Sequence, residues 1–444
     1  MKPEEALQYI KDNSISAIHL KFNQLPGPSQ HLVVTARELD AADDTAGGIF
    51  TKGINKNNLL LIPDPNTAVL DPVCEEPTLT MICDLVDPLT KKPSPKDPRY
   101  IAKKAEQYLK ATGLAEVCRF GPKAEFFIFD EAEWNNSKEE FSGPRPPLKD
   151  CYSQLPLQSL TNDLGKEIML ATEKAGIKGE MHLHGTVSGK QAKINLESGS
   201  LTQIADQITL YKYIVKNVAR KQNKIATFMP KPLAGASGSS MHTQVSLWNN
   251  NINLFYDPAG YALLSRNAKY FIGGLLKHAA SLMAFCAPTT NSYKKLVPVD
   301  QAPVNLIYSQ INGSAAIRIP EHSENLKSKW VEFMPADCSC NPYLAFSAML
   351  LAGLDGIHNK IDPGNPVDQE LHELPPRTAE KISRLPRTLQ ESLDALEKDH
   401  SFLFCGDVFT RDVIDEWIQI KRENEIEEVR TRPHPYEYDL YFDI

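Results

Sequence analysis

The sequence lacks several features that would place it in a particular class of protein at once. Its eight cysteines include no C-x-x-C pair, so no zinc ribbon or dithiol redox motif is indicated. The first ten residues, MKPEEALQYI, contain no apolar core of the kind a signal peptide needs. The most apolar run, residues 341–357, is too short to cross a bilayer and contains Asp355. We therefore expect a cytoplasmic protein with reduced thiols and no membrane partner.

The charge balance excludes nucleic acid as the main partner. The formal net charge is −8, and no block of like charge is long enough to form an interaction tail. Cys338 and Cys340 form a lone C-x-C, which is a weak metal signal; two buried thiols are the favoured interpretation. Apolar residues make up 42% of the chain and charged residues 23%, which is typical of a globular protein with a large core.

The pattern along the chain indicates two domains of α+β type. Residues 15–88 read as short alternating segments, among them 58–64 and 67–71, and this pattern favours a small and mostly β domain at residues 1–97. Asp97 before Pro98 is a typical helix start, and we expect residues 98–444 to form a much larger domain. Helices are predicted from Pro98 to Gly113, over 159–175, 199–222 and 342–357 and twice near the C-terminus, and strands over 124–129, 240–248 and 314–319.

Residues 120–130, FGPKAEFFIFD, read as a buried strand that carries Lys123 and Glu125. Side chains alternate between the two faces of a strand, so both head groups point to the same side. Lys and Glu are seldom buried without a partner. Either Lys123 forms an internal ion pair, or its stem bends so that its head group stays hydrated.

Several long stretches resemble glutamine synthetase of the bacterial class I type. They are residues 226–248, 287–320 and 341–364 and the tail PHPYEYDLYFDI. The resemblance implies a small N-terminal β-grasp domain, followed by a glutamine-synthetase catalytic-type α/β domain with a curved antiparallel sheet. It also implies a homo-oligomer, a dodecamer of two hexameric rings, whose active sites lie between neighbouring subunits and whose C-terminal segments tie the rings together.

The resemblance implies a reaction in nitrogen metabolism. ATP and Mg²⁺ or Mn²⁺ phosphorylate the γ-carboxylate of glutamate, and ammonia then displaces phosphate. Hard divalent cations held by carboxylates suit such chemistry, and arginines clamp carboxylate and phosphoryl oxygens.

The positions that would hold the metal ions depart from the family's pattern. Three ligands are retained, as Glu125, His242 and Glu332. By the resemblance, Lys123, Gly185 and Lys193 stand where the family has glutamate ligands. Two glutamates and two lysines sum to zero charge without any metal, so we expect no metal cofactor here. The paired change at Lys123 and Lys193 also favours the internal ion pair.

The positions that would carry out the transfer depart as well. Degenerate positions, by the resemblance, are Lys295, Gln301 (the family's catalytic glutamate), Gly313, Trp330 and Met334, with further changes at Ser237 and Gln244. A remnant that would contact nucleotide or substrate is Gly238, Ser246, Arg318 and Lys327. An amide such as that of Gln301 cannot act as a base.

These substitutions predict a catalytically inactive homologue, a pseudoenzyme, that keeps the ring-forming scaffold for a structural, regulatory or ligand-sensing role. Co-assembly with an active glutamine synthetase is left open, as is residual binding of ATP. The alternative is an ATP-dependent ligase that joins glutamate to ammonia or an amine with altered site chemistry. A further hypothesis places a zinc ion on His182, His184 and His242, although relic histidines with ordinary hydrogen-bond partners are the favoured interpretation.

Overall fold

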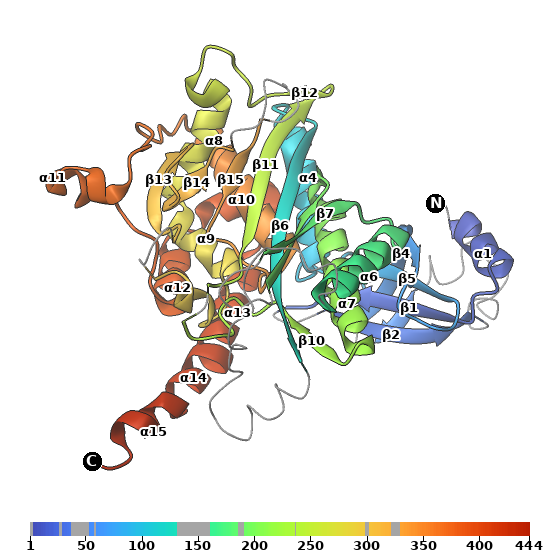
Figure 1. Cartoon of the computed structure of the whole chain (residues 1–444). Coiled ribbons are helices and arrows are strands. Elements are labelled where there is room, and N and C mark those ends of the chain that lie inside the picture. The colour runs from blue at the N-terminus through green and yellow to red at the C-terminus, as the bar shows by residue number, and fades with distance from the viewer. Residues whose placement is uncertain are drawn as a thin grey trace.

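The computed structural model describes residues 3–25, 29–36, 53–56, 59–130, 160–184, 191–235, 237–297, 302–320 and 329–444. Its strands form two sheets, one of five strands near the N-terminus and one of ten strands in the rest of the chain (Figure 1). Each sheet has its own hydrophobic core. The predicted α+β fold class is confirmed by this arrangement, whereas the domain boundary at residue 97 stays a prediction.

The N-terminal sheet has the strand order β2-β1-β5-β4-β3 and pairs β1 with β5 in parallel. Its elements are α1 (Pro3–Asp12), β1 (Ala17–Phe22), β2 (Gln30–Thr35), β3 (Ile54–Lys56), β4 (Leu59–Leu70) and β5 (Thr78–Val86). Two short segments predicted around residues 60 and 68 are in fact the single strand β4. Its register against β5 shifts between Asp64 and Val69, where the sequence suggested a break.

The large sheet runs in the order β13-β14-β15-β11-β6-β8-β7. Its strands are β6 (Val117–Asp130), β7 (Gly179–His184), β8 (Gln191–Leu196), β11 (Met241–Asn249), β13 (Asn305–Ser309), β14 (Ala315–Arg318) and β15 (Val331–Phe333), with the short strands β9 (Gly199–Ser200), β10 (Lys224–Thr227) and β12 (Ile252–Asn253) at its margins. The three strands predicted from sequence in this part of the chain are present as β6, β11 and β14.

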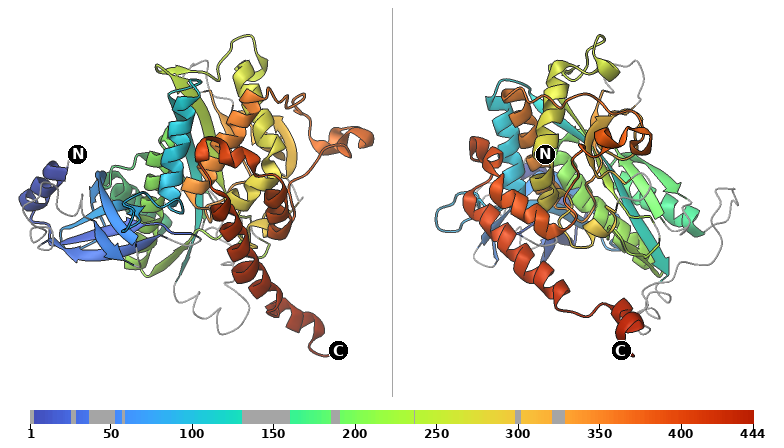
Figure 2. Two further views of the ribbon diagram at one scale, coloured as in Figure 1. Left: turned by 180° about the vertical axis from the view of Figure 1, so that it is seen from behind. Right: turned by 90° about the vertical axis from the view of Figure 1, so that its left-hand side faces the viewer.

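Helices cover the face of this sheet that carries the apolar side chains of β6. Seen from behind, α4 (Pro98–Ala111) lies in front of the sheet (Figure 2). It starts as predicted, because the Asp97 carboxylate accepts from the Arg99 N–H. Pro98 has no N–H and so leaves no donor unpaired at the first helical position. The other long helices here are α6 (Leu160–Lys174), α7 (Leu201–Lys221), α8 (Arg266–Lys277), α9 (Ala279–Cys286) and α10 (Pro342–His358).

Helix α10 is the centre of the large core. It is buried along almost its whole length, and the ring of Phe346 stacks on Phe120 of β6 at 4.7 Å between centroids. It crosses α8 so closely that a Cβ at Gly274 would lie 2.0 Å from the Ala352 carbonyl oxygen. Likewise a Cβ at Gly356 would lie 2.1 Å from the Tyr270 carbonyl oxygen. Only glycine fits at this crossing.

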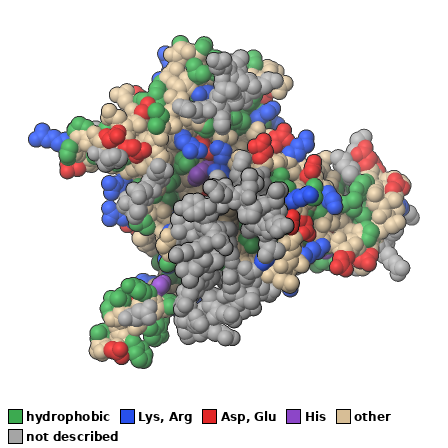
Figure 3. Space-filling view, viewed as in Figure 1, with side chains coloured by type: hydrophobic (Ala, Val, Ile, Leu, Met, Phe, Trp, Pro, Cys, Tyr) green, Lys and Arg blue, Asp and Glu red, His purple; other side chains and the backbone are tan. Residues whose placement is uncertain are grey.

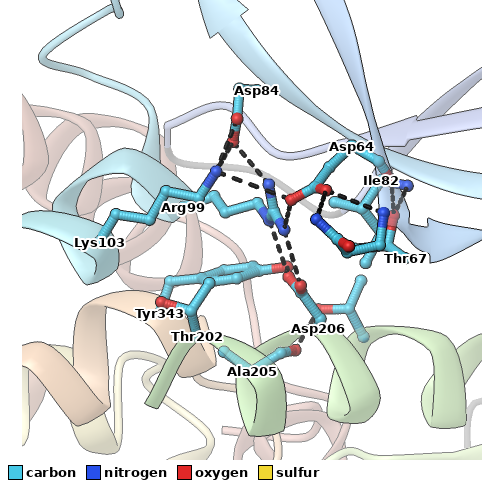
Figure 4. Close-up of polar contacts among 12 residues, drawn as sticks. Asp64, Thr67, Ile82, Asp84, Arg99, Lys103, Thr202, Ala205, Asp206 and Tyr343 are labelled. Atoms are coloured by element: carbon cyan, nitrogen blue, oxygen red, sulfur yellow. Dashed lines mark hydrogen bonds and ion pairs between the residues drawn. The ribbon is translucent and has the colours of Figure 1, made fainter. Parts of the chain in front are cut away.

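A buried arginine joins the N-terminal sheet to the helices of the large core. The Arg99 guanidinium donates two hydrogen bonds of 3.0 Å to the Asp206 carboxylate on α7 (Figure 4). It also donates to Asp84 on β5 at 2.6 Å and to Asp64 on β4 at 2.7 Å. Lys103, one turn further along α4, contacts Asp84 at 2.6 Å. Residues from four elements are therefore held by one cation.

The C-terminal part of the chain is helical; α12 and α13 pack against the large core, and only the last helices leave the body of the molecule. Its elements are η4 (Leu371–Glu373), α11 (Pro376–Ala379), α12 (Leu389–Lys398), η5 (Ser401–Asp407), α13 (Arg411–Lys421), η6 (Arg422–Glu427), α14 (Glu428–Arg430) and α15 (Pro435–Tyr441). Helix α15 protrudes and exposes large apolar side chains, among them Phe442 and Ile444 (Figures 1 and 3). Within the described ranges, every helix is too short or too polar to cross a bilayer.

Candidate functional site

The face of β6 away from the helices carries the charged side chains of the candidate site. Phe120, Ala124 and Phe126 point into the core, so the alternating Lys123 and Glu125 lie on the opposite face. Lys, Arg and His side chains gather near the centre of this side of the molecule (Figure 3). The cross-strand neighbours come from β8, β11, β14 and β15.

The internal ion pair predicted for Lys123 is present. Its Nζ lies 2.7 Å from Glu332 Oε1, and the Glu332 side chain is fully buried. The other carboxylate oxygen accepts from Arg318 Nε at 2.9 Å and from Nη2 at 2.7 Å. Burial alone would raise the pKa of Glu332, but Lys123, His242 and Arg318 outweigh it and lower that pKa to about 2. Glu332 is therefore a firmly ionised carboxylate with a cation on each oxygen.

Lys193 forms the second cation–carboxylate contact of this face. It lies opposite Glu125 in the β6–β8 register, with 3.8 Å between Lys193 Nζ and Glu125 Oε1. The other Glu125 oxygen accepts from the Ser240 N–H at 2.7 Å and from the Gln191 amide at 3.3 Å. Burial lowers the pKa of Lys193, with Glu125 acting in the opposite direction.

Lys295 brings a third ammonium group beneath the loop that precedes β11. Its Nζ donates to the Ala336 carbonyl at 3.1 Å and to Ser240 Oγ at 3.2 Å, and Asp337 Oδ2 lies 3.8 Å away. Burial lowers the pKa of Lys295, while Asp337 and Glu125 raise it. A Cβ at Gly238 would lie 2.5 Å from the Lys295 Cβ, so glycine is required for the loop to pass.

His242 lies in this cluster as an uncharged imidazole. It is paired with Lys123 in the β11–β6 register. Burial lowers its pKa to about 3, although Glu332 raises it. Its Nδ1 is buried and has no hydrogen-bond partner among the described residues. The neutral ring has one N–H donor, and its other nitrogen is available as a hydrogen-bond acceptor or a metal ligand.

The described side chains do not fit the two divalent cations that the resemblance implies. Both oxygens of Glu332 already contact cationic groups, and Glu125 faces Lys193. A divalent ion about 4 Å from an ammonium group would be repelled by roughly 8 kcal/mol at an effective dielectric constant of 20. Among the three retained ligands, all of which lie in the described part of the chain, only the His242 ring forms no ion pair with a cationic side chain. We derive no chemical step through resident metal ions.

The other predicted positions are spread more widely. Ser246 is buried on β11 and accepts from the Trp248 indole N–H at 2.7 Å. Trp330 and Met334 flank β15 and are buried, and Gly313 lies in the turn before β14. Outside the described residues lie Gly185, Gln301 and Lys327. Asp43 and Asp44 also lie outside them; by the resemblance, either could be the aspartate that their loop lends to the active site of a neighbouring subunit. His182 and His184 lie on β7, where only the backbone is described.

Sequence reasoning missed two features: the surroundings of Lys295 and a cavity that lies outside this face. Asp337 and Ser240 complete the surroundings of Lys295, and neither stood out because both come from loops without a pattern. A cavity of about 630 Å³ opens elsewhere, between the N-terminal sheet and α7, and includes Lys21, Lys212 and Lys216 among its lining residues. Cys338 and Cys340, the lone C-x-C of the sequence, also line that cavity, whereas Lys123, Lys193 and Lys295 do not.

Comparison with known proteins places these features in a family. The model of the glutamine synthetase catalytic domain matches residues 95–441. The chain is 45% identical to a glutamine synthetase of Frankia alni over all of this chain and 99% of that one, and 45% identical to one of Streptomyces coelicolor over 99% of each. Among solved structures, Plasmodium falciparum glutamine synthetase superposes with a TM-score of 0.84 at 28% identity, and a GmaS/ADP complex with 0.82 at 25%, each over 99% of both chains.

These relatives correct one prediction. The hypothesis of a catalytically inactive pseudoenzyme is wrong, because proteins 44–45% identical over nearly their full length are named as glutamine synthetases. The substitutions at individual positions were given too much weight against a likeness that extends along the whole chain. The alternative of an ATP-dependent ligase agrees better with the comparisons. The chain belongs to the glutamine synthetase family.

Proposed function

We propose that this chain is an ATP-dependent ligase that joins the γ-carboxylate of glutamate to ammonia or to an amine. The observation that carries the proposal is the identity of 45% over the full length of proteins named glutamine synthetase. A GmaS/ADP complex of the same fold adds that a structural relative holds a nucleotide. In this proposal the chain diverges from its relatives in the chemistry of the site, because lysines replace carboxylate ligands.

The charges on the β6 face suit such a reaction. Glutamate's γ-carboxylate would attack the γ-phosphorus of ATP and release ADP; ammonia or an amine would then attack the acyl phosphate, release inorganic phosphate and lose a proton. Negative charge gathers on phosphoryl oxygens throughout, and fixed cations that face it supply the largest share of catalysis. Lys123, Lys193, Lys295 and Arg318 place four cations near three carboxylates, a net charge of +1 without any metal.

Exposure and pairing together divide these four cations into two roles. Arg318 keeps 36% of its side chain exposed, and Lys193 and Lys123 keep 16% and 15%. Arg318 as the most exposed cation, and Lys193 as the more loosely paired lysine, can contact a substrate anion, whereas Lys123 is held at 2.7 Å by Glu332. Lys295, with 4% exposed, is closed in by Ala336, Ser240 and Asp337 and serves to hold the loop. We propose that Arg318 and Lys193 bind phosphoryl or carboxylate oxygens and that Lys123 fixes Glu332, which orients Arg318.

The test is ATP-dependent formation of γ-glutamyl hydroxamate by the purified chain, with hydroxylamine as the amine and magnesium supplied as the ATP complex. We expect turnover in the native chain and a loss of at least about a hundredfold in Lys193→Met and in Arg318→Met, each of which removes one charge-assisted contact in the transition state. Lys216→Met, on the separate cavity, is the matched control and should retain activity. Absence of any ATP-dependent product from the folded native chain would reject the proposal.

Methylamine and ammonia in place of hydroxylamine would identify the natural acceptor. A preference of more than about tenfold in kcat/KM for one of them corresponds to roughly 1.4 kcal/mol of differential binding in the transition state. Lys193→Glu provides a second check on the site chemistry. It returns a carboxylate to a position that carries one in the family's pattern, but we expect it to stay inactive because the rest of that metal site is not rebuilt.

We also propose that the protein is a cytoplasmic homo-oligomer, a dodecamer of two six-membered rings, acting in nitrogen metabolism. The protruding helix α15 supports this proposal, since its exposed Tyr436, Tyr441 and Phe442 form the kind of apolar surface that a second subunit covers. Mixed assembly with a second glutamine synthetase would use the same surface. Native mass spectrometry of the purified protein would give both the subunit number and any second chain.

A further inference from the structure

Three side chains with metal-binding atoms meet in the N-terminal sheet, far along the chain from the cluster around Lys123. His19 lies on β1, Asp71 directly follows β4, and Cys74 lies in the connection to β5. One ligand atom of each, an imidazole nitrogen, a carboxylate oxygen and the thiol sulfur, lies within 4.8 Å of the other two. Parallel pairing of β1 with β5 sets His19 opposite Thr80 and so brings the first ligand beside the β4–β5 connection.

We propose that His19, Asp71 and Cys74 form a zinc site. Imidazole, carboxylate and thiolate are the ligand types that zinc takes in tetrahedral sites. Bonds of about 2.0–2.1 Å at a tetrahedral angle would separate the nitrogen and oxygen by roughly 3.3 Å, and His19 Nδ1 lies 3.5 Å from Asp71 Oδ2. Cys74 is only partly buried, so the fourth position can hold water and a metal ion can reach the site from solvent.

His19 has a buried ring nitrogen that lacks a hydrogen-bond partner in the described part of the chain. Its Nδ1 is buried and makes no hydrogen bond that meets ordinary geometry within the described ranges. Burying such a nitrogen without a partner costs about 1–3 kcal/mol. A zinc ion between Nδ1 and the carboxylate would provide the missing contact, which a chance meeting of side chains would not require.

Asp71 is held as a metal ligand should be. Its Oδ1 accepts from the Val73 N–H at 3.0 Å, and its Oδ2 accepts from the hydroxyls of Thr80 at 2.9 Å and Tyr213 at 3.0 Å. Burial would raise the pKa of Asp71, but these hydrogen bonds and the contact with His19 lower it to about 2. Such outer contacts orient a ligating carboxylate and support metal affinity. Asp71 therefore needs no proton loss on binding, while Cys74 loses its thiol proton to solvent.

One neighbouring cation opposes the metal. Lys21 Nζ lies 3.1 Å from the centre of the Tyr213 ring, and the Lys21 side chain is buried. Zinc with one carboxylate and one thiolate is neutral, so a protonated Lys21 would leave the group with a charge of +1. Removal of this ammonium by Lys21→Met should strengthen zinc binding, by at least about threefold, since it removes a repulsive charge from a poorly solvated site.

The site would tie the β4–β5 connection to β1 beside α7. Because Tyr213 of α7 donates to Asp71, a metal ion that fixes this carboxylate would also fix a contact between the N-terminal sheet and the large core. We expect the bound metal to raise the unfolding temperature of the chain without altering the β6 face.

The experiment uses the full chain, freed of metal by a chelator and titrated with Co²⁺ as a spectroscopic substitute for Zn²⁺. A tetrahedral thiolate site gives a near-ultraviolet sulfur-to-cobalt charge-transfer band, which one equivalent of Zn²⁺ should remove. Cys74→Ser should abolish the band, and His19→Gln should weaken binding by at least about tenfold. Cys405→Ser, at another partly buried cysteine, and His31→Gln, whose ring lies 6.0 Å from that of His19, are the matched controls and should leave it intact.

Circular dichroism would confirm that each variant is folded. If the ligand variants do not fold, the expected gain in zinc affinity of Lys21→Met still tests the proposal. A band that survives Cys74→Ser, or zinc affinity that does not change on His19→Gln, would overturn the proposal. So would a native chain that shows no charge-transfer band at all.

Discussion

Replacement of Arg99 by methionine tests the buried junction between the N-terminal sheet and the helices α4 and α7 most directly. Methionine keeps most of the length of the side chain but removes every donor. Asp206, which is itself buried, would keep only the hydrogen bond from the Tyr343 hydroxyl, at 2.6 Å. Among the described cations, Asp64 and Asp84 would keep Lys103, at 3.8 and 2.6 Å, and Asp64 would also keep the hydrogen bonds from Asn66. Removal of one partner from a buried ion pair costs about 3–5 kcal/mol, and we expect Arg99→Met to lose that much at pH 7.

The pH dependence of this loss has a definite sign. Burial raises the pKa of Asp206 even beside Arg99, and Arg99 lowers the pKa of Asp64 against the effect of burial. Without the guanidinium the folded state holds these carboxyl groups more readily in the neutral form. The penalty should therefore be largest at pH 7 and should shrink as the pH falls, because protonation removes the uncompensated charge.

Urea-induced unfolding, followed by tryptophan fluorescence at one fixed protein concentration, would measure the effect. Lys103→Met is the matched control, because Lys103 is 31% exposed and leaves Asp84 paired with Arg99. We expect it to cost about 1 kcal/mol or less. If the two variants had equal unfolding midpoints, the interpretation of Arg99 as the central cation of the junction would be refuted.

Three further predictions concern the site and the assembly. Lys123→Met leaves the buried Glu332 with Arg318 alone; because the Glu332 pKa of about 2 lies below the ordinary 4.5, its stabilisation is lost as the pH falls between these values, so the deficit of the variant, about 3 kcal/mol at pH 7, should shrink at pH 3 in urea unfolding, whereas the exposed Lys174→Met should show no such change. Gly238→Ala places a Cβ 2.5 Å from that of Lys295 and should lower hydroxamate formation at least about tenfold with unchanged far-ultraviolet circular dichroism; full activity would contradict the crowding argument. Deletion of residues 435–444 removes the exposed apolar helix and should reduce the assembly to smaller units in light scattering; an unchanged mass would show that other surfaces hold it together.

Local signals predicted much of the fold. The Asp97–Pro98 start of α4 and the buried helix from Pro342 follow from capping and periodicity, which act over a few residues. Strand β4 was predicted as two segments, 58–64 and 67–71, whereas pairing with β5 on both sides of the interval between them keeps the strand continuous. Tertiary pairing of this kind is not encoded in any short window.

The site was predicted in part for the same reason. Alternation along β6 placed Lys123 and Glu125 together, and the resemblance supplied Glu332 as a partner. Arg318 was expected at the site, but its ion pair with Glu332 was not predicted. The role of Arg99 was not predicted, because its partners lie 15, 35 and 107 residues away in the sequence. Contacts over such separations depend on the packed fold and leave no pattern in the sequence.

The crossing of α8 and α10 limits how this chain can vary. Alanine is the better helix former at most positions, by about 1 kcal/mol over glycine, yet at Gly274 or Gly356 one added methyl group would act as a wedge between two backbones. Such a wedge would push α10 against Phe120 and so displace the strand that carries Lys123 on its other side. At these two positions the small volume of the side chain, rather than its charge or polarity, is therefore the property that selection must preserve, although both lie far from any reacting atom.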